Sequence, residues 1–355
     1  MSGSTTPGSG GANALLSSIR RLAHGECLIA DELTRAFTIV MSGEATPAQM
    51  AALLIGLRVK GETPEEVAAV VRALRSVMVV LPAERPEELV DTCGTGGGAV
   101  LTFNISTAAA LVAAGAGVRI AKHGNRSFTS LCGSADVLEA LGVGIDVSVA
   151  TMAAALRDAG IVFMFAPLMH PAMRHVGPVR REIAVPTVMN IVGPLANPAF
   201  AGRQVVGVAD PRRVPLIAGA LRELGTMHAL IVHGEPGLDE VSPLGETHVV
   251  EIKDGALREW SIDPKRYGFG AVRAEQLAGG SPNENAEIVL HILAGEGNDG
   301  ATAAVVLNAA AAIYVGGGAV TYDDAVEQAQ RALRDGEGMR ALERLRAAFA
   351  AQPAA

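Results

Sequence analysis

Apolar positions in the amino-terminal part of the chain repeat at the spacing of helices. Residues 51–57 and 67–80 carry apolar side chains every three or four positions, which places these side chains on one face of a helix. The segment 1–13 is rich in Gly, Ser and Thr and has no such pattern, as is typical of an unstructured tail. We therefore predict a disordered tail over 1–13 and a small all-helical subdomain of about four helices over 14–83.

Two residue pairs mark where helices of this subdomain begin. Thr46 precedes Pro47, and Thr63 precedes Pro64, which is followed by two glutamates. Threonine can cap the unpaired N–H groups of a first helical turn, and proline fits the first helical position because it has no N–H to leave unpaired. The pattern predicts helix starts at both prolines.

From about residue 88, short apolar runs alternate with longer helical patterns. Such alternation is typical of βαβ units, which build a mainly parallel central sheet flanked by helices. The predicted strands are a run ending at Val90, 161–165, 205–208 and 229–232, and the predicted helices are 148–159, 214–224, 301–315 and one or two more over 321–350. We therefore assign 88–165 and 198–350 to a larger α/β domain, and part of 166–197 to the helical subdomain.

One stretch of the larger domain, 91–141, holds two polar loops that each lead into a helix. The first loop contains the glycines of GTGGG, followed by Asn104, Ser106 and Thr107 at the start of an alanine-rich helix. Glycines let the backbone approach an anion closely, and a helix N-terminus offers unpaired N–H groups and the positive end of the helix dipole. The pattern indicates a phosphate site, although the glycines alone are also compatible with an ordinary turn.

The second loop is basic and polar. It comprises Lys122, His123, Asn125, Arg126, Ser127, Thr129 and Ser130, and it leads into a predicted helix over 135–141. Lys122 and Arg126 provide positive charge, and Ser106, Thr107 and Ser134 can either cap their helices or contact a ligand or metal. Two helix N-termini in one αβ unit suit two phosphate groups better than a set of unrelated turns.

A segment at 166–181, APLMHPAMRHVGPVRR, gathers several basic side chains between methionines and prolines. The basic residues are His170, Arg174, His175, Arg180 and Arg181. Arginine can grip a carboxylate through two parallel hydrogen bonds, while Met and Pro can form apolar walls. The segment therefore indicates a pocket for an acidic, ring-bearing molecule; the alternative is a charged helix face.

Asp239 and Glu240 are adjacent carboxylates in a turn, HGEPGLDEVS, that follows a predicted strand. Adjacent side chains do not share one face of a helix or strand, but on a loop they can serve one Mg²⁺ or one ion each. Mg²⁺ commonly takes one or two protein carboxylates and completes its shell with water and substrate phosphate. A magnesium site is one interpretation of this turn, and a solvated surface turn is the other.

Composition disfavours several classes of protein. The chain has 355 residues, a formal net charge of −8 and 3% aromatic residues, so it offers neither a basic surface nor many stacking rings to nucleic acid. Cys27, Cys93 and Cys132 have no metal-ligand spacing. Cys93 and Cys132 lie beside the two polar loops, but no base is identifiable for either, so we prefer a buried packing role to a nucleophilic one. The first residues lack the charged and apolar regions of a signal peptide, and no uninterrupted apolar run of about 18 residues is present. We expect a soluble, cytoplasmic protein.

Three groups of motifs, GTGGG with TFNIST, KHGNRSFTS, and CGSADVLEALG, resemble the signature loops of the anthranilate phosphoribosyltransferase family, which shares its fold with the pyrimidine nucleoside phosphorylases. The resemblance extends from about Leu15 to the last helix. It implies a transferase that moves the phosphoribosyl group of 5-phosphoribosyl 1-pyrophosphate to the amine of anthranilate in tryptophan biosynthesis. It also implies Mg²⁺ and a homodimer formed through the helical subdomain. We assign no general base, because a neutral aromatic amine has a free lone pair, so catalysis would be electrostatic and positional.

The resemblance implies roles for individual residues. The implied contacts of the phosphoribosyl donor are Gly94, Gly97, Gly98, Thr102, Asn104, Ile105, Ser106, Thr107, Lys122, His123, Gly124, Asn125, Arg126, Ser130 and Ser134. The implied contacts of anthranilate are Gly94, Asn125, His170 and Arg180, with Arg180 on the carboxylate. The implied magnesium ligands are Ser106, Asp239 and Glu240.

Two positions depart from the family pattern. Family members commonly have GTGGD where this chain has Gly98, and many carry Lys or Arg where this chain has Leu131. The first change removes a carboxylate from the phosphate loop, and the second removes a nearby positive charge, so both bear on donor binding rather than on the fold. Two other functions stay open: a pyrimidine nucleoside phosphorylase that uses the same loops, and a non-catalytic relative that binds nucleic acid or a regulatory partner.

Overall fold

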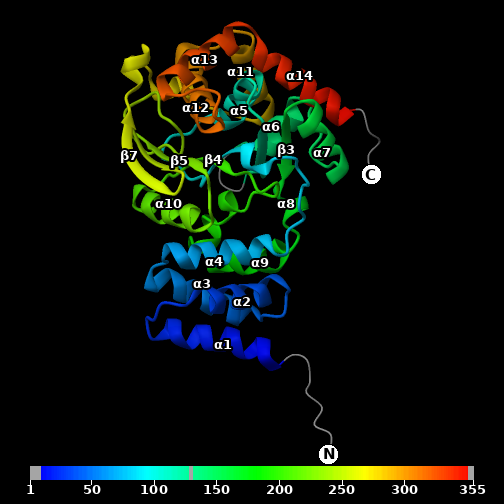
Figure 1. The fold of residues 1–355 in the computed structure, drawn as a ribbon, viewed down its shortest axis with the longest axis vertical. Helices are drawn as coiled ribbons and strands as arrows, with labels where there is room; N and C mark the ends of the chain where they lie inside the picture. Colours follow the sequence, from blue (N-terminus) through cyan, green and yellow to red (C-terminus); the bar gives the residue numbers. More distant parts are fainter. Residues whose placement is uncertain (1–8, 128–130, 351–355) are drawn as a thin grey trace, which may run out of the picture. The chain divides into compact units, whose positions relative to one another are not determined.

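The structure, a computed structural model, describes residues 9–127 and 131–350, which form two compact units (Figure 1). The helical unit consists of Met1–Val79, Met169–Ala196 and Leu216–Leu224. The α/β unit consists of Val80–Leu168, Asn197–Pro215 and Gly225–Ala355. Ser130, an expected donor contact, and the start of the expected tail lie outside the described residues.

Four helices at the start of the chain form most of the helical unit: α1 (Ser9–Ala23), α2 (Ala30–Met41), α3 (Pro47–Lys60) and α4 (Pro64–Arg75). The predicted starts at both prolines are confirmed, since the side chains of Thr46 and Thr63 accept hydrogen bonds from the N–H groups of Gln49 and Glu66. The expected tail was too long, because α1 already begins at Ser9. Once the apolar part of α1 is helical, each additional residue propagates the helix at little cost.

Helix α10 (Val214–Glu223) differs most from the domain organisation that we expected. Its residues from Leu216 onwards belong to the helical unit, whereas the sequence placed them in the α/β domain. A Cβ on Gly219 would lie 2.7 Å from Cγ of Pro64, and Arg72 Nη2 donates a hydrogen bond of 2.8 Å to the carbonyl of Glu223. A βαβ pattern predicts that a helix connects two strands, but it does not predict which unit of the protein the helix packs with.

In the described ranges the strands form one seven-stranded sheet in the order β3-β2-β1-β4-β5-β6-β7. Their bounds are β1 Val90–Gly94, β2 Ile120–Gly124, β3 Ile161–Phe165, β4 Arg203–Gly207, β5 His228–Gly234, β6 Thr247–Lys253 and β7 Ala256–Ile262. β1 to β5 pair in parallel, and β6 and β7 add an antiparallel edge. The mainly parallel sheet is confirmed, and the hairpin of β6 and β7 was not among the predicted strands.

Helices flank this sheet within the α/β unit, as expected. They are α5 Ile105–Gly115, α6 Ser134–Ala140, α7 Val149–Asp158, α11 Pro282–Leu293, α12 Asp299–Gly316, α13 Tyr322–Arg334 and α14 Glu337–Ala350. α12 packs on β1, β4 and β5, while α5 packs on β1 and β2, and Figure 1 shows α5 and α12 together on one side of the strands. α12 is long and apolar enough to cross a membrane, but 78% of it is buried inside the protein, as in a core helix.

Two strands extend into segments that we expected to be loops. Asp91, Thr92 and Cys93 lie in β1, and Lys122 and His123 lie in β2. All but Cys93 are buried. Charged and polar side chains in a buried parallel strand need partners from other elements, and these partners are not visible in the local pattern. The prediction of a loop at Lys122 was therefore wrong.

Candidate active site

The predicted donor loops lie at the carboxyl ends of the parallel strands. β1 has β2 on one side and β4 on the other, so the chain reverses its direction of winding between β1 and β4. Ligands of open α/β sheets bind outside the carboxyl ends of the strands at such a switch point. Gly94 ends β1, Gly124 ends β2, and Asp239 follows β5. The sheet topology thus collects three segments that are far apart in the sequence.

The glycine loop encloses a carboxylate of the protein itself. Gly96 and Gly97 have φ of 69° and 80°, which favour glycine, and the Gly96 N–H donates to Oδ2 of Asp239 at 2.8 Å. A Cβ on Gly94 would lie 2.5 Å from this oxygen. A Cβ on Gly98 would lie 3.2 Å from Oδ1 of Asp239, so a larger residue here would compete with Asp239 for space. The glycines therefore serve close packing of Asp239 as well as any approach of phosphate.

Gly207, at the end of β4, makes the tightest contact with this loop. A Cβ on Gly207 would lie 1.6 Å from the carbonyl oxygen of Asp239, so Gly207→Ala must displace Asp239. We expect the variant to lose at least about 3 kcal/mol of stability, at the upper end of overpacking effects. Thermal unfolding measures this, with Gly193→Ala as the control because a Cβ there meets nothing within 4 Å. Equal melting temperatures for the two variants would contradict the prediction.

Lys122 is the buried cation of the site. Only 4% of its surface is exposed, and its Nζ donates to the carbonyl of Thr92 at 2.5 Å and to Oγ of Ser106 at 3.2 Å. Burial lowers the pKa of Lys122, while the nearby carboxylates of Asp91 and Glu240 oppose this shift. The ammonium is thus held beneath the first turn of α5 by fixed oxygen atoms.

Ser106 and Thr107 lie within the first turn of α5, after its N-cap position. The N-cap position is Asn104, which makes no side-chain capping bond, so of the two alternatives for Ser106 and Thr107 the capping role does not hold. The Ser106 N–H donates to the carboxylate of Glu240, and the buried Thr107 hydroxyl has no hydrogen-bond partner among the described residues. Ile105 is the buried first residue of the helix, and Thr102 lies in the loop before it.

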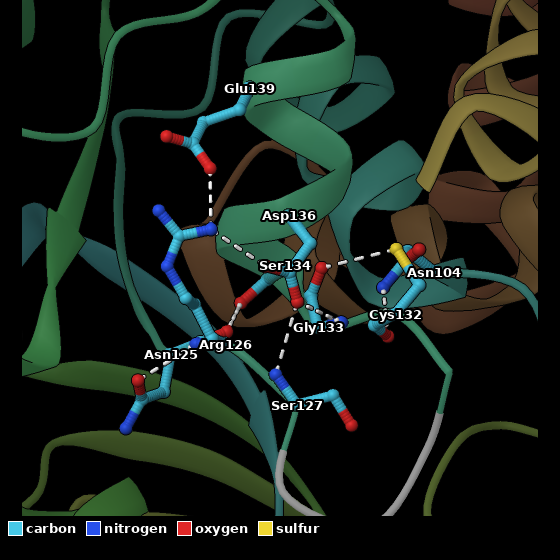
Figure 2. Close-up of polar contacts among 9 residues, drawn as sticks. All are labelled: Asn104, Asn125, Arg126, Ser127, Cys132, Gly133, Ser134, Asp136 and Glu139. Atoms are coloured by element: carbon cyan, nitrogen blue, oxygen red, sulfur yellow. Dashed lines mark hydrogen bonds and ion pairs between the residues drawn. The ribbon is translucent and has the colours of Figure 1, made fainter. Parts of the chain in front are cut away.

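Arg126, an expected donor contact, is already ion-paired. Figure 2 shows its guanidinium between two acids of α6, with Nη1 at 2.8 Å from Asp136 and 2.5 Å from Glu139. These pairs leave little net positive charge at this position. Arg126 therefore ties the loop to α6, and Lys122 remains the basic residue at the donor loops.

The loop from Asn125 to Ser134 is closed by hydrogen bonds between its two ends (Figure 2). Oδ2 of Asp136 accepts hydrogen bonds from the N–H of Ser127 at 3.1 Å and from the N–H of Gly133 at 2.9 Å. Gly133 is the N-cap residue of α6, so the second bond also belongs to the cap of this helix. Ser134 does not cap the helix, as one alternative had it, but donates to the carbonyl of Asn125 at 3.3 Å. Leu131, which departs from the family pattern, is 66% exposed.

Asn104 is held from a distant part of the chain. Its Nδ2 donates to the carbonyl of Cys132 at 3.2 Å, and its Oδ1 accepts from Asn285 of α11 at 2.9 Å. Asn285 itself is almost fully buried. The two asparagines thus join α5, α11 and the loop before α6, and no local sequence pattern predicts this link.

Asp239 and Glu240 fit a divalent cation. Both residues are half-buried; desolvation and repulsion from Asp239 raise the pKa of Glu240 to about 8, and desolvation also raises the pKa of Asp239. Two buried like charges side by side are unfavourable unless a cation neutralises them. In the described part of the chain no group of three or more His, Cys, Asp or Glu side chains could hold a metal. The pair therefore suits Mg²⁺, which takes further oxygen ligands from a phosphate substrate.

The expected anthranilate contacts His170 and Arg180 belong to the helical unit. Arg180 lies on α9 (Met173–Ile183) and is half-buried, and the described residues offer its guanidinium no ion pair. Burial lowers the pKa of Arg180 and lowers that of His170 to about 4, so His170 is neutral at physiological pH. A half-buried arginine without an acidic partner among the described residues is suited to bind a carboxylate.

The thiols near the donor loops are not activated. Burial raises the pKa of Cys93 well above its usual value and raises the pKa of Cys132 to about 11. Both thiols therefore stay protonated near neutral pH and are poor nucleophiles. This agrees with the packing role that we preferred for them.

Asp91 and Asn197 form a buried polar pair that was not among the predicted features. β1 pairs with β2 at Val90 and Ile120, and beyond this point side chains bridge the strands: Oδ1 of Asp91 accepts from the N–H of His123 at 3.1 Å. Asn197 Nδ2 donates to Oδ2 of Asp91 at 2.7 Å and to the carbonyl of Ala121 at 2.9 Å. Asp91 and Asn197 therefore secure the strand that carries Lys122. An asparagine in the otherwise apolar segment PLANPAF was the available signal.

We expect Asn197→Leu to destabilise the protein more at pH 8 than at pH 5. Burial raises the pKa of Asp91 to about 6, above its usual 3.8, so its stability contribution is present at low pH and is lost as the pH rises through 6. The Asn197 amide opposes this shift, and its removal raises the pKa further. The loss should be about 2–4 kcal/mol at pH 8. Urea unfolding at both pH values measures it, and an equal loss at both would contradict the assignment.

Sequence comparison places the chain in a family of transferases. Residues 86–339 match the glycosyl transferase family, a/b domain, and residues 16–78 match its helical bundle domain. The chain is 47% identical to the anthranilate phosphoribosyltransferase of Roseiflexus sp. (strain RS-1) over 328 residues, which are 92% of this chain and 96% of that protein. It is 45% identical to that of Geobacillus kaustophilus (strain HTA426), over 93% and 96% of the two chains.

Solved structures agree with the sequence relatives. The anthranilate phosphoribosyltransferase from Thermus thermophilus has a TM-score of 0.88 at 41% identity, covering 94% of this chain and 99% of its own. The enzyme from Saccharomyces cerevisiae in complex with PRPP and Mg has a TM-score of 0.87 at 27% identity, covering 96% and 99%. Another structure of the yeast enzyme, at 27% identity and a TM-score of 0.86 over the same shares of the two chains, holds 4-fluoroanthranilate. The chain belongs to the anthranilate phosphoribosyltransferases of this glycosyl transferase family.

Proposed function

We propose that this protein transfers the phosphoribosyl group of 5-phosphoribosyl 1-pyrophosphate to the amine of anthranilate, giving N-(5-phosphoribosyl)anthranilate and pyrophosphate. The observation that carries the proposal is the grouping of Lys122, the first turn of α5 and the pair Asp239–Glu240 at the carboxyl ends of β1, β2 and β5. A buried cation, helix N–H groups and a carboxylate pair are the groups needed to bind a pyrophosphate with a divalent cation. Relatives over nearly the full length carry the name of this activity.

The proposed reaction needs charge stabilisation more than proton transfer. The amine nitrogen forms a bond to C1 of the ribose while the bond from C1 to the pyrophosphate oxygen breaks, and the nitrogen then loses a proton. Positive charge develops on the ribose ring, as in other glycosyl transfers, and negative charge on the pyrophosphate. Lys122 and the N–H groups of the donor loops would stabilise the leaving group. A bound Mg²⁺, held by Asp239, Glu240 and Ser106, would supply further neutralisation of the pyrophosphate.

We propose that the other expected donor contacts act mainly through their backbone and their position. Gly94, Gly97, Gly98, Gly124 and the N–H groups near Asn104 would line the phosphates, and Thr107 would offer its unpaired hydroxyl. Arg126 would act indirectly, because its charge is neutralised by Asp136 and Glu139. Asn125 would contact both substrates, as the family pattern implies.

For the acceptor, we propose that Arg180 binds the carboxylate of anthranilate, with neutral His170 on the same substrate. We expect Arg180→Gln to raise KM for anthranilate about 10- to 100-fold, the effect of losing a charge-assisted hydrogen-bond pair. KM for the donor should stay within about twofold. Steady-state kinetics with each substrate varied measure both constants, with the exposed neighbour Arg181→Gln as the control. A rise in KM for the donor alone would contradict the proposal that Arg180 binds anthranilate.

Three further expectations concern the metal, the assembly and the binding partners. We propose that Mg²⁺ is the metal, because the related yeast enzyme was solved with PRPP and Mg. We propose a soluble, cytoplasmic homodimer formed through the helical unit, on the strength of the family pattern. Nucleic acid is not an expected partner, given the net charge of −8.

The deciding experiment follows the fluorescence of anthranilate with 5-phosphoribosyl 1-pyrophosphate, with and without Mg²⁺, in the wild type. We expect a decay that requires both the donor and the metal. No decay at saturating donor and Mg²⁺ would overturn the proposal. Phosphorolysis of thymidine or uridine would then favour a pyrimidine nucleoside phosphorylase, and firm retention on heparin at moderate salt would favour a nucleic-acid-binding relative.

A further inference from the structure

Helix α12 contains one buried polar side chain in an otherwise apolar interior. Asn308 is 3% exposed, and its buried neighbours in the helix are Gly, Ala, Val, Leu and Ile. An unpaired amide in such surroundings would be strongly unfavourable. Its presence therefore calls for a partner outside the helix.

The partner is the backbone of Val241. Oδ1 of Asn308 accepts from the Val241 N–H at 2.8 Å, and Nδ2 donates to the Val241 carbonyl at 2.8 Å. The second Nδ2 proton goes to the carbonyl of Ala304, one turn earlier in α12, at 2.9 Å. The amide thus pairs with both polar groups of a single residue, as a neighbouring strand would.

Val241 directly follows Asp239 and Glu240. On the other side of these carboxylates, Gly234 and Leu238 form a β-bridge, in which Leu238 N–H donates to the Gly234 carbonyl at 2.7 Å. The carboxylate pair therefore lies on a short segment that is anchored at one end by this bridge and at the other end by Asn308. Because Glu240 and Val241 are covalent neighbours, movement of Val241 would move the carboxylates.

We propose that Asn308 is a positioning residue for the divalent cation, which acts through the Val241 backbone to hold Asp239 and Glu240 in binding geometry. This inference rests on the proposed function of the carboxylate pair. Two buried like charges repel each other, so an unanchored loop would relax and separate them. An amide in the core of α12 prevents this without adding another charge. Residues that orient metal ligands typically affect metal affinity 10- to 100-fold when they are replaced.

The test compares Asn308→Ser with Asn308→Leu. In a helix the serine hydroxyl can bond the carbonyl four residues earlier, here that of Ala304, so this variant keeps the bond within α12 and loses the two bonds to Val241. Leucine removes all three bonds and keeps a side chain that branches at Cγ. Leu307→Ala and Ile313→Val, both fully buried in the same helix, serve as controls for stability loss alone.

The first readout is binding of Mn²⁺ in the presence of pyrophosphate, measured by electron paramagnetic resonance without turnover. We expect Asn308→Ser and Asn308→Leu to weaken Mn²⁺ binding at least about tenfold, and controls of matched melting temperature to bind within about twofold of wild type. The second readout is the Mg²⁺ concentration for half-maximal transfer, which should rise in parallel. If Asn308→Leu does not fold, the Mn²⁺ affinity of Asn308→Ser alone tests the proposal.

Wild-type Mn²⁺ affinity in a folded Asn308→Ser variant would overturn the inference while leaving the proposed function intact. Equal weakening in the Asn308 variants and the matched controls would also overturn it, because it would show a general effect of stability. A wild type that binds no Mn²⁺ with pyrophosphate and shows no transfer would overturn the proposed function, and the inference with it.

Discussion

The double variant Asp239→Asn, Glu240→Gln is expected to lose activity at least about 10³-fold while it keeps or gains stability. Both amides can still accept the hydrogen bonds that the carboxylates receive from the N–H groups of Gly96 and Ser106. The fold therefore keeps its local contacts, whereas the cost of desolvating two adjacent ionisable carboxyl groups disappears. Without these charges the site has no carboxylate to hold a divalent cation next to the pyrophosphate.

The measurement combines initial rates over a range of Mg²⁺ concentrations with thermal unfolding in the absence of metal. Glu259→Gln, a change on an exposed residue of β7, is the control and should leave both quantities unchanged. A variant that is inactive because it has unfolded would show a lower melting temperature, and this would contradict the argument. Full activity at high Mg²⁺ would mean that the carboxylates are not needed for the reaction.

Lys122→Met is expected to lower kcat/KM for the donor about 10²- to 10³-fold. Methionine has a similar length and keeps the apolar packing, but it removes the ammonium that donates to Thr92 and Ser106. Lys122→Arg should not restore activity, because the planar guanidinium does not match the three oxygen atoms of Thr92 and Ser106 that accept from the compact ammonium. Some stability should also be lost, since Asp91 and Glu240 would remain buried without their counter-charge.

Isothermal titration with pyrophosphate separates binding from stability in this variant. We expect the affinity of pyrophosphate to fall in Lys122→Met and to stay near the wild-type value in Arg126→Met, because the guanidinium of Arg126 is already neutralised by Asp136 and Glu139. An equal loss in the two variants would show that both basic residues face the donor. An unchanged affinity of Lys122→Met for pyrophosphate would show that Lys122 does not bind the donor.

Helix starts and most strands could be predicted because their signals are local. Thr46 and Thr63 cap their helices through residues three positions later, and the strand at 161–165 was expected within the bounds that the structure shows. The strands that carry the site were harder. Lys122 and His123 looked like loop residues, because their partners Thr92 and Asp91 come from another strand.

The candidate site shows the same division. Its residue types were visible in the motifs, but the roles of several residues changed once their neighbours were known. Arg126 had been expected to face phosphate, whereas its charge is paired within the loop and α6. Gly94 and Gly98 had been expected to face an anionic ligand, and the structure shows that they also make room for Asp239, as does Gly207.

By itself, the sequence determined the family, the parallel α/β architecture with a helical subdomain, and the residue types that can bind pyrophosphate, Mg²⁺ and a carboxylate. These properties depend on periodicity and on short motifs, in which the interacting residues are close along the chain. Only the tertiary structure decided that Asn308 anchors Val241, that Asn197 pairs with Asp91, and that α10 belongs to the helical unit. Each of these contacts joins segments distant in sequence, and a buried polar group finds such a partner only after the chain has folded around it.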